Sequence, residues 1–206
     1  FQAPEPPRGP VRATLRSQKK FCQNAADERA LSEGFRFCEK RADHVVGVFS
    51  QFFRHSKGRW AGDPFRLNEW QQDEVIRPLF GWVREDGTRR FRRTYIEIPK
   101  KNYKSTTAAG IGLYMLLFDG EAGAEVYSLG TDKDQARIVH NEAIAMVEAS
   151  ACADAVNVNR TTGAIVFGTS VYRALSGAPG GKHGLNIHCA IADELHEWQS
   201  DKLWNS

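Results

Sequence analysis

The sequence predicts an α/β fold, with a mainly parallel sheet flanked by helices and a helical appendage at the N-terminus. From about residue 93 onward, β-rich runs alternate with helical runs, which is the order of elements in a parallel sheet. Before residue 60, apolar residues recur at helical intervals. At 206 residues, with 41% hydrophobic and 26% charged residues, the chain can form one substantial domain and an appendage.

The first part of the chain is expected to be a tail followed by helices. Residues 1–10 contain four prolines, which favours an extended tail. Apolar residues between Val11 and His55 have helical spacing, and Ser32 is a possible N-cap. Residues 56–64 are rich in turn formers. We therefore predict an N-terminal segment over residues 1–60 and a main domain over residues 61–206.

The main domain is expected to begin with a helix and then to alternate between strands and helices. Helices are expected at about residues 68–80, 104–118 and 132–149, the last with Thr131 or Asp132 as its N-cap. Strands are expected at residues 93–98, 125–129, 164–168 and 186–192.

Charge is unevenly distributed along the chain. Residues 1–93 hold 19 Lys+Arg against 12 Asp+Glu, a balance of +7, whereas residues 94–206 hold 9 against 13, a balance of −4. A basic front half allows contact with a polyanion. Basic residues scattered over solvated helices would give the same balance, so both interpretations stay open.

Cysteine spacing and hydropathy restrict the class of protein. The 4 cysteines stand far apart with no CxxC pair, which indicates reduced thiols rather than a zinc ribbon or a disulfide framework. No run approaches the roughly 18 apolar residues of a membrane helix, and the first residues lack the apolar centre of a signal peptide. We therefore expect a soluble, intracellular protein. Because the first residue is not Met, we also expect the sequence to be a piece of a longer product.

The segment after the first expected strand carries candidate phosphate-binding residues. A phosphate loop leaves a strand, turns so that backbone N–H groups face the phosphates, and opens a helix whose N-terminus favours negative charge. Against the pattern GxxxxGK[ST], Lys104 and Ser105 occupy the lysine and hydroxyl positions, whereas Ile98 and Tyr103 replace the glycines. The alternative is a basic turn that only caps a helix.

The fourth expected strand ends in an acidic pair, Asp193 and Glu194. Ligands of open parallel sheets lie beyond the carboxyl ends of the strands, where the phosphate loop would also lie. Asp193 is then placed to hold a magnesium ion through water, and Glu194 to orient or deprotonate an attacking water. Alone, such a pair equally fits a helix N-terminus that favours acids. Two half-sites in the right order make a shared nucleotide site the better hypothesis.

Several stretches together resemble the N-terminal ATPase region of tailed-bacteriophage terminase large subunits, the motors that drive DNA into procapsids. The likeness runs from about His55 to the end of the chain, over the stretches "HSKGRWAGDPFRLNEWQ", "LFGW", "RRFRRTYIEIPKKNYKST", "GAEVYSLGTDKDQA" and "GLNIHCAIADELHEW". The resemblance implies an ASCE-type P-loop NTPase fold and hydrolysis of ATP with Mg²⁺, coupled to translocation of double-stranded DNA.

The resemblance also implies roles for individual residues. Lys104 corresponds to the phosphate-contacting lysine, Ser105 to the magnesium hydroxyl, Asp193 to the metal-binding acid and Glu194 to the catalytic acid. Gln71 corresponds to a glutamine that reads the adenine edge. The alternative, and the commoner case, is a glutamine that only occupies the surface of a helix. The nucleotide-binding set would therefore comprise Gln71, Pro99, Lys100, Lys101, Asn102, Tyr103, Lys104, Ser105 and Thr106.

The sequence departs from the family pattern at two places. Tyr103 stands where the family has glycine, so either the loop adopts another backbone or nucleotide binding is weaker, because a bulky residue at positive φ is costly. Many family members have a trans-acting arginine before a glycine, upstream of the acidic pair, whereas this chain has Lys182-His183-Gly184 there. Arg173 and Lys182 are the candidate substitutes for that arginine.

Further expectations follow from the same resemblance. The partners would be double-stranded DNA, a portal protein and a small terminase subunit, with a homo-oligomeric ring during packaging in the cytoplasm of the infected host. The full-length protein is expected to be an endonuclease as well, through residues outside this sequence. The alternatives are another helicase-like P-loop NTPase, or a degenerate domain that binds DNA or a portal without turnover.

Overall fold

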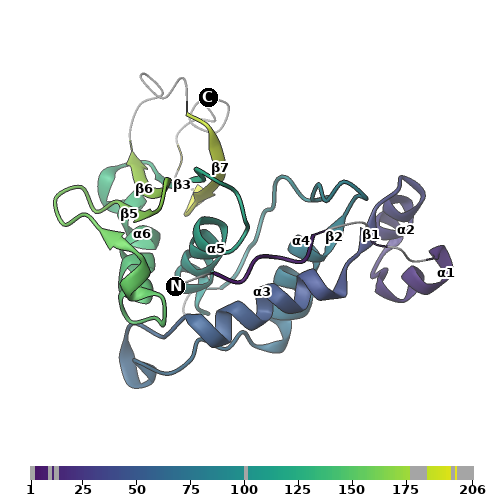
Figure 1. Cartoon of the computed structure of the whole chain (residues 1–206), viewed down its shortest axis with the longest axis horizontal. Helices are drawn as coiled ribbons and strands as arrows, with labels where there is room; N and C mark the ends of the chain where they lie inside the picture. Colours follow the sequence, from purple (N-terminus) through teal and green to yellow (C-terminus); the bar gives the residue numbers. More distant parts are fainter. Residues whose placement is uncertain are drawn as a thin grey trace. The chain divides into compact units, whose positions relative to one another are not determined.

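The computed structural model describes residues 3–8, 11, 14–99, 102–176, 185–195 and 198. The chain divides into two compact units (Figure 1). The first unit comprises Phe1–Glu5, Gln51–Phe65 and Ile98–Ser206, and the second comprises Pro6–Ser50 and Arg66–Glu97. The predicted domain boundary between residues 60 and 61 stays a prediction.

A five-stranded mixed sheet forms the framework of the first unit, in the order β4-β5-β6-β3-β7. Its strands are β3 (Glu125–Gly130), β4 (Asn157–Val158), β5 (Ile165–Phe167), β6 (Ser170–Ser176) and β7 (Ile187–Ala192). β3 pairs in parallel with both β6 and β7, whereas β5 pairs antiparallel with β4 and β6. The parallel pairs bring the ends of β3 and β7 to the same edge of the sheet.

Two helices, α5 (Lys104–Leu117) and α6 (Lys133–Glu148), pack against each other and on the sheet. The buried side chain of Tyr172, on β6, contacts both of them. Its ring centroid lies 4.8 Å from that of His140 in α6, and a Cβ added to Gly112 in α5 would lie 2.9 Å from its hydroxyl oxygen. The two helices therefore share one face of the sheet, and Gly112 permits the close approach of α5.

The elements of the first unit largely match the sequence predictions. The helices expected at residues 104–118 and 132–149 are α5 and α6, and the expected strands at 125–129, 164–168 and 186–192 are β3, β5 and β7. Asp132 is the N-cap of α6, since its side chain accepts hydrogen bonds from the backbone N–H groups of Asp134 and Gln135. β4 and β6 were not predicted.

The strand expected at residues 93–98 is a wrong prediction. This segment runs without regular secondary structure, and within the described part of the chain no ladder partner pairs with it. Tyr95 is 72% exposed, so its aromatic ring is not part of a core. β-propensity describes how a residue fits a paired, half-buried surface, and it cannot form a strand where no neighbouring strand is available.

The second unit is mainly helical. Its helical segments are α1 (Leu15–Gln18), η1 (Lys19–Phe21), α2 (Ala25–Ser32), most of α3 (Glu39–Phe52), the π-helical turn η3 (Gln71–Ile76) and α4 (Arg77–Gly81). β1 (Arg36–Phe37) and β2 (Trp82–Val83) form an antiparallel pair. The helix predicted at residues 68–80 is thus confirmed, with a π-helical first part. Ser32 is not an N-cap: it ends α2, which Asn24 caps.

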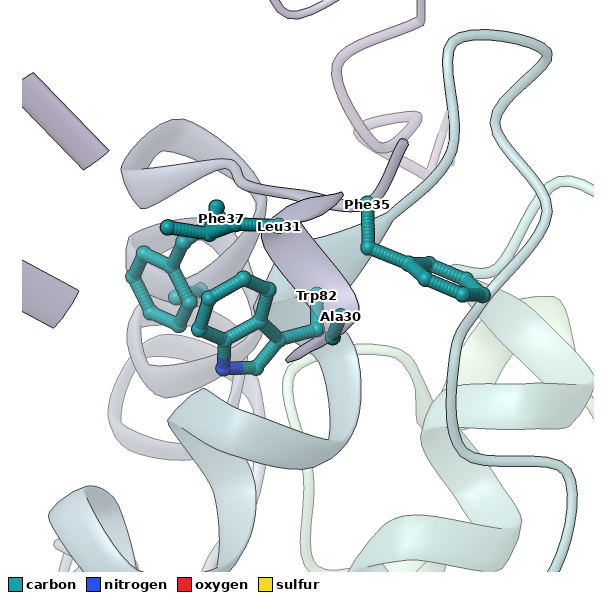
Figure 2. Packing of buried hydrophobic residues seen from close by; sticks show 6 residues of the cluster. Ala30, Leu31, Phe35, Phe37 and Trp82 are labelled. Carbon is teal, nitrogen blue, oxygen red and sulfur yellow. The ribbon is translucent and has the colours of Figure 1, made fainter. Parts of the chain in front are cut away.

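A small apolar cluster stabilises the second unit, formed by Ala30, Leu31, Phe35, Phe37, Ala42 and Trp82 (Figure 2). The rings of Phe37 and Trp82 meet edge to face at 5.7 Å. Arg90 lies over Trp82 and forms a 2.5 Å ion pair with the nearly buried Asp27, which satisfies both charges at the edge of this core.

In the described part of the chain, no helix has the length and apolar character required to cross a bilayer.

Candidate active site

The predicted basic and acidic half-sites meet in the structure. Lys104 is the first residue of α5, and its Nζ lies 3.1 Å from Oδ1 of Asp193 and also bonds Oε1 of Glu194. Both acids directly follow Ala192, the last residue of β7. The lysine and Glu194 are 90 residues apart in the chain, so only the fold brings them together.

Electrostatics at this site keep Lys104 charged. Partial burial lowers the pKa of Lys104, but its hydrogen bonds to Glu194 and Asp193, together with their negative charges, outweigh that effect and raise the pKa above its ordinary value of 10.5. Asp193 is largely buried, with a side chain 12% exposed, and its Oδ1 also accepts from the backbone N–H of Glu194. The site is therefore a compact cluster of one cation and two anions.

Two residues of this site have strained backbones. Among the described residues, Tyr103 at φ 58° and Glu194 at φ 50° are the non-glycine positions with positive φ. Such conformations cost about 1–3 kcal/mol each and concentrate at functional sites. Tyr103 takes the left-handed conformation that a glycine would adopt easily. Whether nucleotide binding is weaker with tyrosine at this position stays a prediction.

The remaining phosphate-loop residues are arranged around the start of α5. Ser105 and Thr106 lie in its first turn and are partly buried. The carbonyl oxygen of Tyr103 accepts from the N–H of Thr107 at 2.8 Å, and the side-chain amide of Asn102 donates to the carbonyl of Pro99 at 3.2 Å. Lys100 and Lys101 lie outside the described residues, as do Lys182 and the rest of its tripeptide.

Gln71 belongs to the second unit and is 2% exposed. Its Oε1 accepts from the N–H of Asn68 at 2.9 Å, and Oδ1 of Asn68 accepts from the N–H of Gln71 at 3.0 Å. This reciprocal pair caps the helical segment that follows. The structure thus gives Gln71 a capping role, and its adenine-reading role stays a prediction.

The acids fit a magnesium ion better than a metal held by protein ligands alone. Among the described residues, no three His, Cys, Asp or Glu side chains gather into a metal cluster. Magnesium typically takes one or two carboxylates and completes its shell with phosphate oxygens and water. Asp193 is a carboxylate of the kind that magnesium takes, and Ser105 follows Lys104 in the first turn of α5.

One buried acid near the site was not predicted from the sequence. Glu142, in α6, has a side chain that is only 10% exposed, and its Oε1 lies 3.4 Å from the hydroxyl of Thr106. The available signal was its position beside the apolar face of α6, between the buried residues Val139, Ala143 and Met146. An acid there would normally require partners.

Comparisons with known proteins agree on one family. Residues 69–206 match the model of the terminase large subunit ATPase domain. The terminase large subunit of Enterobacteria phage HK97 is 27% identical over 158 residues, covering 75% of this chain and 30% of that protein. The crystal structure of the HK97 bacteriophage large terminase has the same fold, with a TM-score of 0.58 at 24% identity, over 74% of this chain and 30% of that one. The chain thus spans about a third of the length of these relatives.

Proposed function

Because this chain belongs to the terminase large subunit ATPase domain family, we propose that Lys104, Ser105, Asp193 and Glu194 form its ATP-hydrolysing site and that hydrolysis drives double-stranded DNA into a procapsid. The observation that supports the site most directly is the contact of Lys104 with Asp193 and Glu194, at the N-terminus of one helix and the end of one strand. This supports the proposal, because phosphoryl transfer uses a lysine for the phosphates and acids for the metal ion and the water, and ligands of parallel sheets lie at the carboxyl ends of the strands.

Each residue has a role that its chemistry permits. Lys104 and the N–H groups at the start of α5 bind the phosphate oxygens, because a lysine charge and a helix N-terminus both favour anions. Ser105 and Asp193 would hold Mg²⁺, which supplies positive charge that neutralises the phosphates. Glu194 orients the attacking water and accepts its proton. Pro99, Lys100, Lys101, Asn102, Tyr103 and Thr106 would complete the phosphate loop, with Gln71 at the adenine edge.

The ion pair between Lys104 and Glu194 suggests how substrate binding prepares the site. In the structure the lysine neutralises the very carboxylate that must act on water. Phosphate groups compete for the same ammonium group, so their arrival would draw Lys104 away from Glu194. Glu194 would then be released as a base only when substrate is present.

A groove along α6 supports DNA as a partner. It has a volume of about 430 Å³ and is lined on the α6 side by Lys133, Arg137 and Asn141, and on the other side by residues 158–163, which include Arg160. Its described lining contains three cations and no acid. Positive grooves of this kind bind phosphodiester backbones without sequence preference.

The portal protein, the small terminase subunit and a homo-oligomeric ring in the host cytoplasm remain proposals that rest on the family.

The proposed function is tested by Mg²⁺-dependent ATP turnover of the full-length protein with duplex DNA. Lys104→Ala and Glu194→Ala should each lower kcat by at least about 10²-fold, because removing one electrostatic or acid–base group typically costs that much. Glu121→Ala, which removes an exposed acid in the loop between α5 and β3, is the control and should leave turnover unchanged. Turnover that none of the three substitutions alters would show that the site is elsewhere.

A further inference from the structure

A buried carboxylate connects the phosphate loop to a segment that the proposed mechanism does not use. Glu142 accepts a 2.7 Å hydrogen bond from the hydroxyl of Ser56 and forms a 2.9 Å ion pair with Nζ of Lys57. Its Oε1 is also 3.4 Å from the hydroxyl of Thr106, in the first turn of α5. Three donors from two distant segments therefore converge on one side chain of α6.

The same segment contacts the phosphate loop at a second place. The ring of His55 meets the ring of Tyr103 at 5.9 Å and the ring of Phe65 at 4.9 Å. Residues 55–57 thus approach the phosphate loop on one side through an aromatic contact and on the other side through Glu142. All of these residues belong to the first unit.

The burial of Glu142 makes these contacts energetically important. A carboxylate removed from water is costly unless charged or hydrogen-bonded partners replace the water. Ser56 and Lys57 supply those partners, while the side chain of Lys57 stays 75% exposed and so keeps much of its own hydration. Ser56 and Lys57 are thereby held against α6, and the Thr106 hydroxyl is held in the direction of Oε1.

We propose that Glu142 is a positioning residue of the nucleotide site. It fixes residues 56 and 57 and the first turn of α5 to α6, so that Lys104 and Ser105 are presented to the phosphates in a constant conformation. The inference rests on the proposed function, and it gives the "HSKG" stretch, residues 55–58, a part in ATP binding. Glu142 does not touch the reacting atoms and acts through Thr106.

The test compares Glu142→Gln and Glu142→Ala with the control Glu121→Gln in the full-length protein. Glu121 belongs to the same unit and is exposed in the loop between α5 and β3. We expect Glu142→Ala to raise the Mg-ATP concentration at half-saturation roughly tenfold, the equivalent of one hydrogen bond to a charged group, while kcat falls less than about threefold. Glu142→Gln, which keeps an acceptor oxygen, should have a smaller effect, and Glu121→Gln none.

Two further measurements separate positioning from general destabilisation. Amide hydrogen exchange at residues 104–107 should be faster in Glu142→Ala than in the wild type, whereas exchange in β3 should not change. Thr106→Val should raise half-saturation as well, and the double variant should be no worse than Glu142→Ala alone, since both changes break one connection.

The outcomes distinguish this inference from the proposed function. Unchanged half-saturation and unchanged exchange at residues 104–107 in Glu142→Ala would overturn the inference, even if its melting temperature falls. In that case Lys104-dependent turnover of the wild type would leave the proposed function standing. A wild-type protein without Lys104-dependent turnover would overturn both.

Discussion

At the scale of single residues, the site concentrates its strain where chemistry is expected. Tyr103 and Glu194 both have positive φ. Tyr103 directly precedes Lys104, and Glu194 directly follows Asp193, which contacts that lysine. Left-handed backbone costs an ordinary residue about 1–2 kcal/mol, so each position must be compensated by its surroundings. For Tyr103, the ring contact with His55 and the carbonyl bond to Thr107 are part of that compensation.

The strain at Tyr103 is measurable with two substitutions that differ only in φ preference. Tyr103→Ala and Tyr103→Gly both lose the contact with His55, but only glycine adopts φ 58° without cost. We expect the glycine variant to be more stable than the alanine variant by about 1 kcal/mol in urea unfolding. Equal stability would contradict a left-handed residue 103. ATP half-saturation of the glycine variant should stay within about threefold of the wild type, because Tyr103 already has the left-handed backbone that glycine would adopt.

At the scale of elements, the groove along α6 gives a prediction about salt. If Lys133 and Arg137 contact phosphates, replacing both by Gln should reduce the slope of log affinity for duplex DNA against log salt by up to about 2, since each phosphate contact contributes about 0.9. Asp134→Asn, which removes an acid from the same turn of α6, should not reduce the slope. A double variant with the wild-type slope would place the DNA contacts elsewhere.

The packing of α6 on the sheet also predicts a dependence on pH. Burial lowers the pKa of His140 below its ordinary value of 6.5. The hydrogen bond from Nε2 to the carbonyl of Gly163 opposes this decrease in pKa, and the charge of Arg137 adds to it. The unfolded chain then binds the additional proton, so the stability contributed by this group is present above pH 6.5 and is lost as pH falls below it. His140→Gln should lose less unfolding free energy than the wild type between about pH 7.5 and pH 5.

The same elements indicate what the sequence can and cannot predict. α5, α6, β3 and β7 were predictable because each combines periodicity with a cap or a breaker, and their order implied that Lys104 and the acidic pair would share a sheet edge. β6 and the segment at residues 93–98 were not, because strand formation depends on partners distant in sequence. Glu142 was missed for a related reason: a charged residue on a helix is normally solvated, and its donors at residues 56, 57 and 106 become visible only in three dimensions.

At the scale of the whole molecule, the described residues of the site include one cation, Lys104, which contacts Asp193 and Glu194. Arg173, one of the two substitutes considered for a trans-acting arginine, is exposed on β6, and Lys182 lies outside the described residues. An arginine supplied by a neighbouring subunit can increase phosphoryl transfer by 10³–10⁵-fold. In the proposed ring, an arginine from a neighbouring subunit would complete the site in this way.

If a neighbouring subunit completes the site, ATP turnover per chain depends on protein concentration. If a neighbour completes the site, turnover per chain should rise at least about tenfold over the concentration range in which light scattering detects assembly, because the added cation stabilises the transition state. Adding Glu194→Ala chains at constant total concentration should reduce turnover in proportion to the inactive sites, if these chains still assemble and supply the cation in trans. Turnover per chain that is constant from monomer to assembly would mean that each chain contains a complete site.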